Sequence, residues 1–151
     1  MSLENLTKEL IQIESISPND AGCFDILESE LNGMNFSCER INYKNVENLY
    51  AVLGSEGPTF CFLGHTDVVP TGPLDKWTYP PFGGEINNQH MYGRGAADRK
   101  GNICAVIDAL KTFLRTEKLN LRMAVLLTSN GEGTPGDGFI DELLEKLKAR
   151  A

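Results

Sequence analysis

A histidine and an aspartate two residues apart follow an apolar stretch of the chain. His65 and Asp67 stand in the sequence Gly-His-Thr-Asp, directly after residues 59–63. An imidazole at the end of a buried strand can ligate a metal ion, and a carboxylate that accepts the other ring N–H fixes the tautomer. The alternative is a histidine that only makes a hydrogen bond at the end of the strand. The spacing by itself leaves both interpretations open.

Two carboxylates occupy comparable positions further along the chain. Asp98 precedes the clearest helical pattern and follows Gly93 and Gly95, which let the backbone approach a site closely. Glu132 lies in the glycine-rich stretch after residues 123–127. Each also has a simpler explanation, because aspartate is a favoured helix N-cap and an acidic residue in a turn is commonly solvated. One histidine with carboxylates is a ligand set that suits zinc, cobalt or manganese.

The elements that must position these residues alternate between strands and helices. Apolar spacing predicts helices over residues 3–13, 24–31, 103–114 and 139–147. It predicts strands over residues 34–38, 49–53, 59–63 and 123–127. Residues 59–63 are apolar on both faces, as in a central strand of a covered sheet. A long loop over residues 66–84 is of the kind that is usually functional, and a hairpin is expected around residues 87–88.

This alternation predicts the fold class and the place of the site. We expect one domain over residues 1–151, with an α/β fold of three layers and a mostly parallel central sheet. Ligands of such sheets bind beyond the carboxyl ends of the strands. His65, Asp98 and Glu132 are therefore expected to meet at one edge of the sheet.

Composition narrows the classes of partner. The chain has 151 residues, with 14 basic and 21 acidic side chains and a net charge of −7, so neither nucleic acid nor an anionic membrane is expected as a partner. No apolar run is long enough to cross a membrane, and the first residues do not form a secretory signal. A cytoplasmic location is expected, with reduced thiols rather than cysteine-held zinc, because no Cys-x-x-Cys pair occurs among the four cysteines, Cys23, Cys38, Cys61 and Cys104.

Three motifs taken together resemble a known family. They are Gly-His-Thr-Asp-Val-Val-Pro-Thr-Gly at residues 64–72, Trp77 with Pro-Pro-Phe at residues 80–82, and Tyr-Gly-Arg-Gly-Ala-Ala-Asp-Arg-Lys-Gly at residues 92–101. They resemble the desuccinylase branch of the dinuclear-zinc aminoacylase and carboxypeptidase metallopeptidases, over effectively the whole chain. The resemblance implies a truncated zinc-peptidase-like catalytic domain. It also implies hydrolysis of a small-molecule amide, N-succinyl-diaminopimelate, on the route to lysine and cell-wall precursors.

The resemblance implies a role for each candidate residue. His65 corresponds to a ligand of one metal ion, Asp98 to the carboxylate that bridges both ions, and Glu132 to a ligand of the other. Asp67 corresponds to the residue that orients His65. The expected cofactor is zinc, or cobalt or manganese, with weak or partial occupancy.

The sequence departs from the family's pattern at two positions beside these residues. The family reads Thr-Ser-Asp-Glu-Glu-Gly where residues 128–133 read Thr-Ser-Asn-Gly-Glu-Gly. The first glutamate of that pattern is the general base, and Gly131 has no side chain to take a proton. Arg99 replaces a methionine and brings a cation beside the expected metal ions. The family's further carboxylate ligand, its lid and dimerisation domain and its late histidine ligand lie beyond residue 151.

Three functional hypotheses follow from this sequence. The chain is a segment of a metal-dependent amide hydrolase, a non-catalytic fragment with residual metal binding, or an interaction module that uses the same fold. We expect no hydrolysis by these residues alone, because the general base is missing. We also expect self-association through the apolar surface on which the rest of the family's catalytic domain packs.

Overall fold

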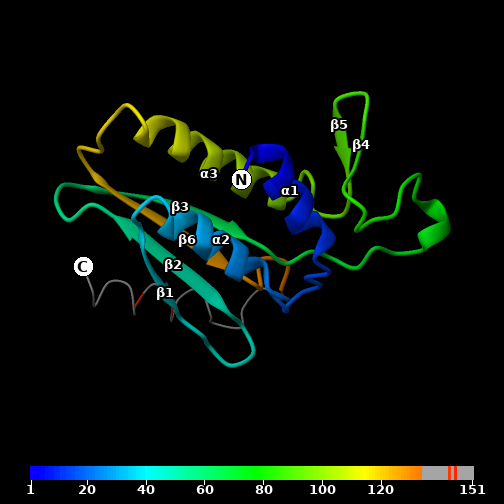
Figure 1. Cartoon of the computed structure of the whole chain (residues 1–151). Coiled ribbons are helices and arrows are strands. Elements are labelled where there is room, and N and C mark those ends of the chain that lie inside the picture. The colour runs from blue at the N-terminus through cyan, green and yellow to red at the C-terminus, as the bar shows by residue number, and fades with distance from the viewer. Residues whose placement is uncertain (134–142, 144, 146–151) are drawn as a thin grey trace.

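A four-stranded sheet carries the candidate residues at one of its ends (Figure 1). The structure, a computed structural model, describes residues 1–133, 143 and 145. The strands are β1 (Ser37–Arg40), β2 (Asn48–Leu53), β3 (Thr59–His65) and β6 (Arg122–Thr128). They lie in the order β1-β2-β6-β3, and β3 runs parallel to β6 along its whole length. The prediction that residues 59–63 and 123–127 form neighbouring strands is therefore confirmed.

The α/β fold is confirmed, but the sheet is mixed rather than mostly parallel. β1 pairs antiparallel with β2, and β2 pairs antiparallel with β6, so only the β3–β6 pair is parallel. A short connection over residues 41–47 joins β1 to β2, and an antiparallel pair needs no longer crossover. Apolar runs in a sequence do not record strand direction, which is why the sequence could not predict this pairing.

Three helices pack on one face of the sheet, as Figure 1 shows. They are α1 (Leu3–Gln12), α2 (Cys23–Asn32) and α3 (Lys100–Leu114). Leu10, Phe24 and Ile103, one from each helix, are fully buried against β2 and β6. Burial of side chains of this size stabilises the fold by about 1.5–3 kcal/mol each. In the part of the chain that the structure describes, no helix is long and apolar enough to cross a membrane.

The opposite face of the sheet carries a smaller apolar cluster. Ile41, Val46 and Leu126 are buried there together with Leu143. The helix predicted over residues 139–147 lies outside the described residues apart from positions 143 and 145. The third layer of the predicted fold therefore stays a prediction.

β3 lies at the edge of the sheet, and the prediction of a central, covered strand is wrong for the described residues. Phe60 is 62% exposed and Leu63 is 50% exposed, and Cys61 between them is also exposed. The residue types of a strand show whether the strand can be buried. Whether it is buried depends on which segments pack against it. The result is an uncharged strand whose outer edge has no partner among the described residues.

The segment between β3 and α3 is irregular, as predicted. It contains the short helix η1 (Leu74–Lys76) and the hairpin strands β4 (Glu85–Asn87) and β5 (His90–Tyr92). Asn88 and Gln89 form the hairpin turn with φ of 48° and 64°, the left-handed values that two-residue turns require. The loop before the hairpin is held by Arg94, whose guanidinium lies 5.1 Å from the centre of the Trp77 ring.

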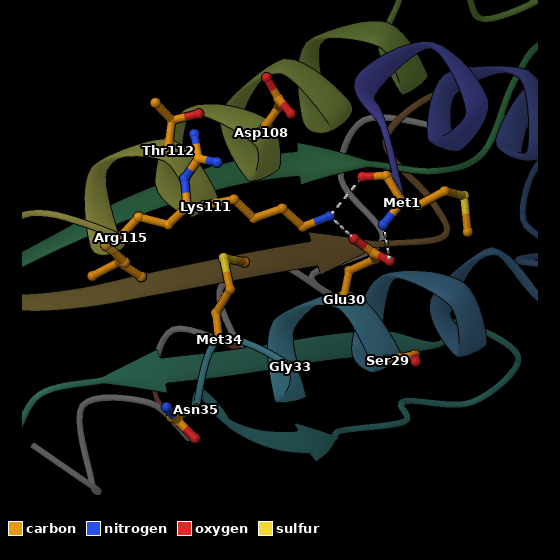
Figure 2. A pocket seen from close by; sticks show the side chains of 11 residues that line it. Met1, Ser29, Glu30, Gly33, Met34, Asn35, Asp108, Lys111, Thr112 and Arg115 are labelled. Atoms are coloured by element: carbon orange, nitrogen blue, oxygen red, sulfur yellow. Dashed lines mark hydrogen bonds and ion pairs between the residues drawn. The ribbon is translucent and has the colours of Figure 1, made fainter.

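A hollow of about 610 Å³ lies on the helical side, at the end of α3 remote from the candidate residues (Figure 2). Lys111 donates to Glu30, and the N-terminal amine of Met1 lies 3.6 Å from the same carboxylate. The Glu30 carboxylate of this hollow is therefore paired with two positive charges, those of Lys111 and of the N-terminal amine.

Candidate metal centre

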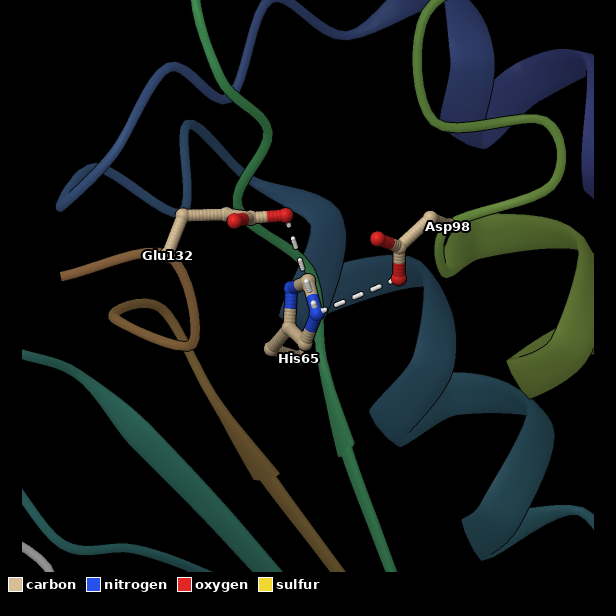
Figure 3. Close-up of side chains that lie close together, drawn as sticks. All are labelled: His65, Asp98 and Glu132. Atoms are coloured by element: carbon tan, nitrogen blue, oxygen red, sulfur yellow. Dashed lines mark ion pairs between the residues drawn. The ribbon is translucent and has the colours of Figure 1, made fainter.

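Three side chains of metal-ligand type meet at the carboxyl edge of the β3–β6 pair (Figure 3). His65 is the last residue of β3, Glu132 follows β6, and Asp98 precedes α3. His65 Nε2 lies 3.6 Å from Asp98 Oδ1 and 4.0 Å from Glu132 Oε1. One ligand atom from each residue lies within 4.8 Å of the others, and no second such group occurs among the described residues. An imidazole nitrogen and two carboxylates at this spacing fit a divalent metal ion that keeps a coordinated water.

Asp98 does not act as the cap of α3. The N-cap position belongs to Arg99, and no side chain makes a cap hydrogen bond there. The Asp98 side chain is 69% exposed, and its carboxylate faces His65, as Figure 3 shows. The N-cap explanation is therefore excluded.

Asp67 is buried and holds two parts of the centre at once. Its carboxylate lies 3.3 Å from His65 Nδ1, so that Nε2 is the ring nitrogen that faces the two other carboxylates. The same carboxylate accepts hydrogen bonds from the backbone N–H groups of Gly131 (2.8 Å) and Glu132 (3.0 Å), and from Ser17 Oγ (2.6 Å). Asp67 thus fixes the histidine ring and the turn that carries Glu132.

These contacts shift the pKa values of the pair in opposite directions. Burial raises the pKa of Asp67, but the hydrogen bonds from His65, Ser17 and the two backbone N–H groups outweigh it and hold that pKa below the ordinary value. The hydrogen bond with Asp67 raises the pKa of His65 above its ordinary value, against the opposing effect of burial. The imidazole is therefore more basic than a free histidine, and a more basic imidazole is a stronger metal ligand.

The loop after α1 supports the centre, and this support could not be predicted from the sequence. In addition to the bond from Ser17 to Asp67, Ser15 Oγ donates to the carbonyl of Thr66 (2.7 Å). Thr66 Oγ1 in turn donates to the buried carboxylate of Asp20 (2.8 Å). Two serines just before a proline indicate a turn at most, so only the structure shows that this loop contacts the end of β3.

Gly131 packs its backbone directly against His65. A Cβ added at this position would lie less than 3.0 Å from the Cβ, Cγ and Cδ2 atoms of the histidine. These atoms are close to the His65 backbone and cannot swing away as the tip of a long side chain can. The position that the resemblance assigns to the general base therefore has no room for any side chain while His65 keeps its place.

Comparison with known proteins decides the family. The family model described as peptidase family M20/M25/M40 matches residues 61–151. The chain belongs to this family. The matched residues include all three ligand-type side chains, His65, Asp98 and Glu132.

Named relatives in this family agree with the predicted resemblance. The chain is 49% identical over 146 residues to a succinyl-diaminopimelate desuccinylase of Dechloromonas aromatica, a match that covers 96% of the chain and 38% of that relative. It is 45% identical to the desuccinylase of Methylococcus capsulatus, over 97% of the chain and 39% of that relative. The chain thus spans about two fifths of the length of the curated relatives that it matches.

Solved structures share the fold. Human carnosine dipeptidase 1 superimposes with a TM-score of 0.85 at 26% identity, covering 98% of this chain and 35% of that protein. An M20 family metallo-carboxypeptidase from Sulfolobus solfataricus gives a TM-score of 0.76 at 26% identity, covering 87% of this chain and 31% of that protein. The M20 family is one of metallopeptidases, so a metal ion belongs to the chemistry of such proteins.

Substitution of Asp67 by asparagine is expected to weaken zinc binding about 10–100-fold, the usual cost of losing the group that orients a ligating histidine. A neutral amide cannot accept all the hydrogen bonds that the carboxylate of Asp67 receives. Ser17→Ala, which removes one of the four donors, is the matched control and should change zinc affinity far less. Calorimetric titration with zinc measures both variants. Wild-type zinc affinity in Asp67→Asn would show that Asp67 does not position the centre.

Proposed function

We propose that this chain holds one divalent metal ion between His65, Asp98 and Glu132, and that it forms part of a desuccinylase-type amide-hydrolase site. The proposal is supported chiefly by the convergence of these three side chains at the end of the parallel strand pair. The identity of 49% to a desuccinylase supports the class of substrate, a small succinylated amide. Titration of the purified chain with zinc, in parallel with an assay of succinyl-diaminopimelate hydrolysis, tests both parts of the proposal.

The residues of the chain would divide the work in this site. His65, Asp98 and Glu132 would hold the metal ion, and Asp67 would keep the His65 ring and the Glu132 turn in place. A zinc ion bound there supplies Lewis acidity and lowers the pKa of its bound water. Gly131 supplies no base, so a proton taken from that water would have no acceptor at the expected position. We therefore propose that the chain by itself does not turn over.

A polar hollow beside Glu132 fits a small-molecule amide. Its volume is about 390 Å³, and Ser17, Asn45 and Asn130 line it together with Glu132. Hydroxyl and amide side chains can donate to and accept from a substrate amide without adding charge. We propose this hollow as the direction from which substrate approaches the metal centre.

Among the described residues, the outer edge of β3 has no partner strand, and this favours a second function, association with another copy of the chain. Residues 59–64 carry no charged side chain, and an uncharged, unpaired edge is a template for pairing with another strand. Phe60 and Leu63 add apolar area on this strand. A second copy presents the same edge, so two copies can pair antiparallel about a two-fold axis.

The chain is therefore expected to form dimers or larger species at high concentration, measured by light scattering coupled to size exclusion. Phe60→Lys should shift the population toward monomer, because a charge at an unpaired edge opposes strand pairing. Phe113→Lys is the matched control, since Phe113 is 42% exposed on α3, away from this edge. A clean wild-type monomer at high concentration would contradict the association proposal.

We also propose a cytoplasmic location, on the basis of the cysteines. All four are free, as in proteins kept in a reducing compartment. Burial raises the pKa of Cys23 and of Cys104 to about 11, so both thiols stay protonated and inert at neutral pH.

A further inference from the structure

Arg99 contacts the oxygen of Asp98 that faces the histidine. Arg99 Nε lies 3.4 Å from Asp98 Oδ1, and His65 Nε2 lies 3.6 Å from that same atom. The side chains of Arg99 and Asp98 are 47% and 69% exposed, so water reaches this ion pair. The guanidinium of Arg99 thus already forms an ion pair with one of the oxygens that would bind a metal ion.

Other cations near this segment point elsewhere. Lys100 is buried and donates to the carbonyls of Leu10 and Ile13, both at 2.7 Å, at the end of α1. Arg94 lies over the Trp77 ring in the preceding loop. Among the described residues, Arg99 is therefore the one arginine or lysine that forms an ion pair with a residue of the centre.

We propose that Arg99 is a cation of the protein that weakens the binding of a metal ion at the centre. The inference rests on the proposed function, because it assumes that His65, Asp98 and Glu132 hold a metal ion. Asp98 and Glu132 together carry two negative charges, which one divalent ion balances. The guanidinium of Arg99 adds a positive charge next to the Asp98 carboxylate. A metal ion that binds at the centre therefore competes with Arg99 for Asp98 Oδ1 and is repelled by the guanidinium charge.

The size of the effect follows from Coulomb's law. A unit charge about 6 Å from a divalent ion, with the screening of bulk water, changes the binding constant by about tenfold. The site is partly exposed, so the screening of bulk water applies, and salt weakens the interaction further. Removal of the guanidinium should therefore increase the affinity for zinc by about tenfold at low ionic strength.

The test is calorimetric titration of the intact chain with zinc, using four variants beside the wild type. Arg99→Met removes the charge and should raise zinc affinity about tenfold, whereas Arg99→Lys keeps the charge and should stay within about threefold of the wild type. Arg115→Met removes one exposed arginine at the far end of α3 and should leave the affinity unchanged. Asp98→Ala reports whether zinc binds at the centre at all.

The outcomes separate the two claims. Equal or weaker zinc binding by Arg99→Met, with binding still dependent on Asp98, would overturn the role of Arg99 and leave the metal centre standing. Zinc binding that is the same in Asp98→Ala and in the wild type would overturn the metal centre itself. An increase of the same size in Arg115→Met would show a general effect of net charge and would also overturn the role of Arg99. Tighter binding by Arg99→Met alone supports the proposal.

Discussion

Asp98→Ala is expected to lower the zinc affinity of the chain about 100-fold or more. Loss of a residue that only orients a ligand costs about 10–100-fold, so loss of a ligand from a three-ligand centre should cost at least the upper end of that range. Asp98 Oδ1 faces His65 Nε2 at 3.6 Å, so both atoms can bind the same metal ion. Among the three ligand-type residues, we expect this substitution to have the largest effect, because Asp98 Oδ1 lies nearer to His65 Nε2 than Glu132 Oε1 does, at 3.6 Å against 4.0 Å.

Calorimetric titration with zinc measures this loss. Asp75→Ala is the matched control, since Asp75 is an exposed aspartate in η1 and takes no part in the centre. The control should bind zinc as the wild type does. Unchanged zinc affinity in Asp98→Ala would show that zinc does not bind between His65, Asp98 and Glu132.

Neither the wild-type chain nor Gly131→Glu is expected to hydrolyse succinyl-diaminopimelate. A general base contributes about 10²–10⁴-fold to such a rate, so the wild type lacks a large part of it. Restoring the glutamate does not restore the base, because its Cβ would collide with His65. The side chain must displace the histidine, and forcing extra atoms into a packed position costs about 1–3 kcal/mol of stability.

The collision of a side chain at position 131 with His65 predicts a second result, which the absence of a base alone does not predict. Gly131→Ala should weaken zinc binding as well, because any Cβ at this position moves His65. Gly33→Ala is the control, since a Cβ there makes only ordinary contacts.

An assay of succinate release with and without a chelator measures turnover. Robust, chelator-sensitive turnover by the wild-type chain would mean that another residue serves as base.

The sequence was sufficient to predict that His65, Asp98 and Glu132 meet at one edge of the sheet. His65 and Glu132 follow the two most apolar strands, and parallel neighbouring strands end at the same edge. Asp98 was predicted from its motif and its place before α3, although an N-cap role was equally compatible with that place. The structure excludes the N-cap role, because the N-cap position of α3 belongs to Arg99.

Other features depend on contacts between distant segments and could not be predicted. The hydrogen bonds of Asp67 join the loop after α1 to the turn after β6, residues that are far apart in the chain. The direction of the Arg99 side chain is likewise set by packing and not by residue type. The exposure of β3 depends on which segments pack beside it, so its apolar composition indicated a covered strand.

A crystal of the chain grown with excess zinc tests the metal centre most directly. Diffraction data collected at the zinc absorption edge locate each bound zinc ion through an anomalous difference map. We predict one peak at the carboxyl edge of β3 and β6, about 2.0–2.2 Å from His65 Nε2 and from oxygens of Asp98 and Glu132. A map with no peak among these three residues, or with its peak at the cysteines, would contradict the account.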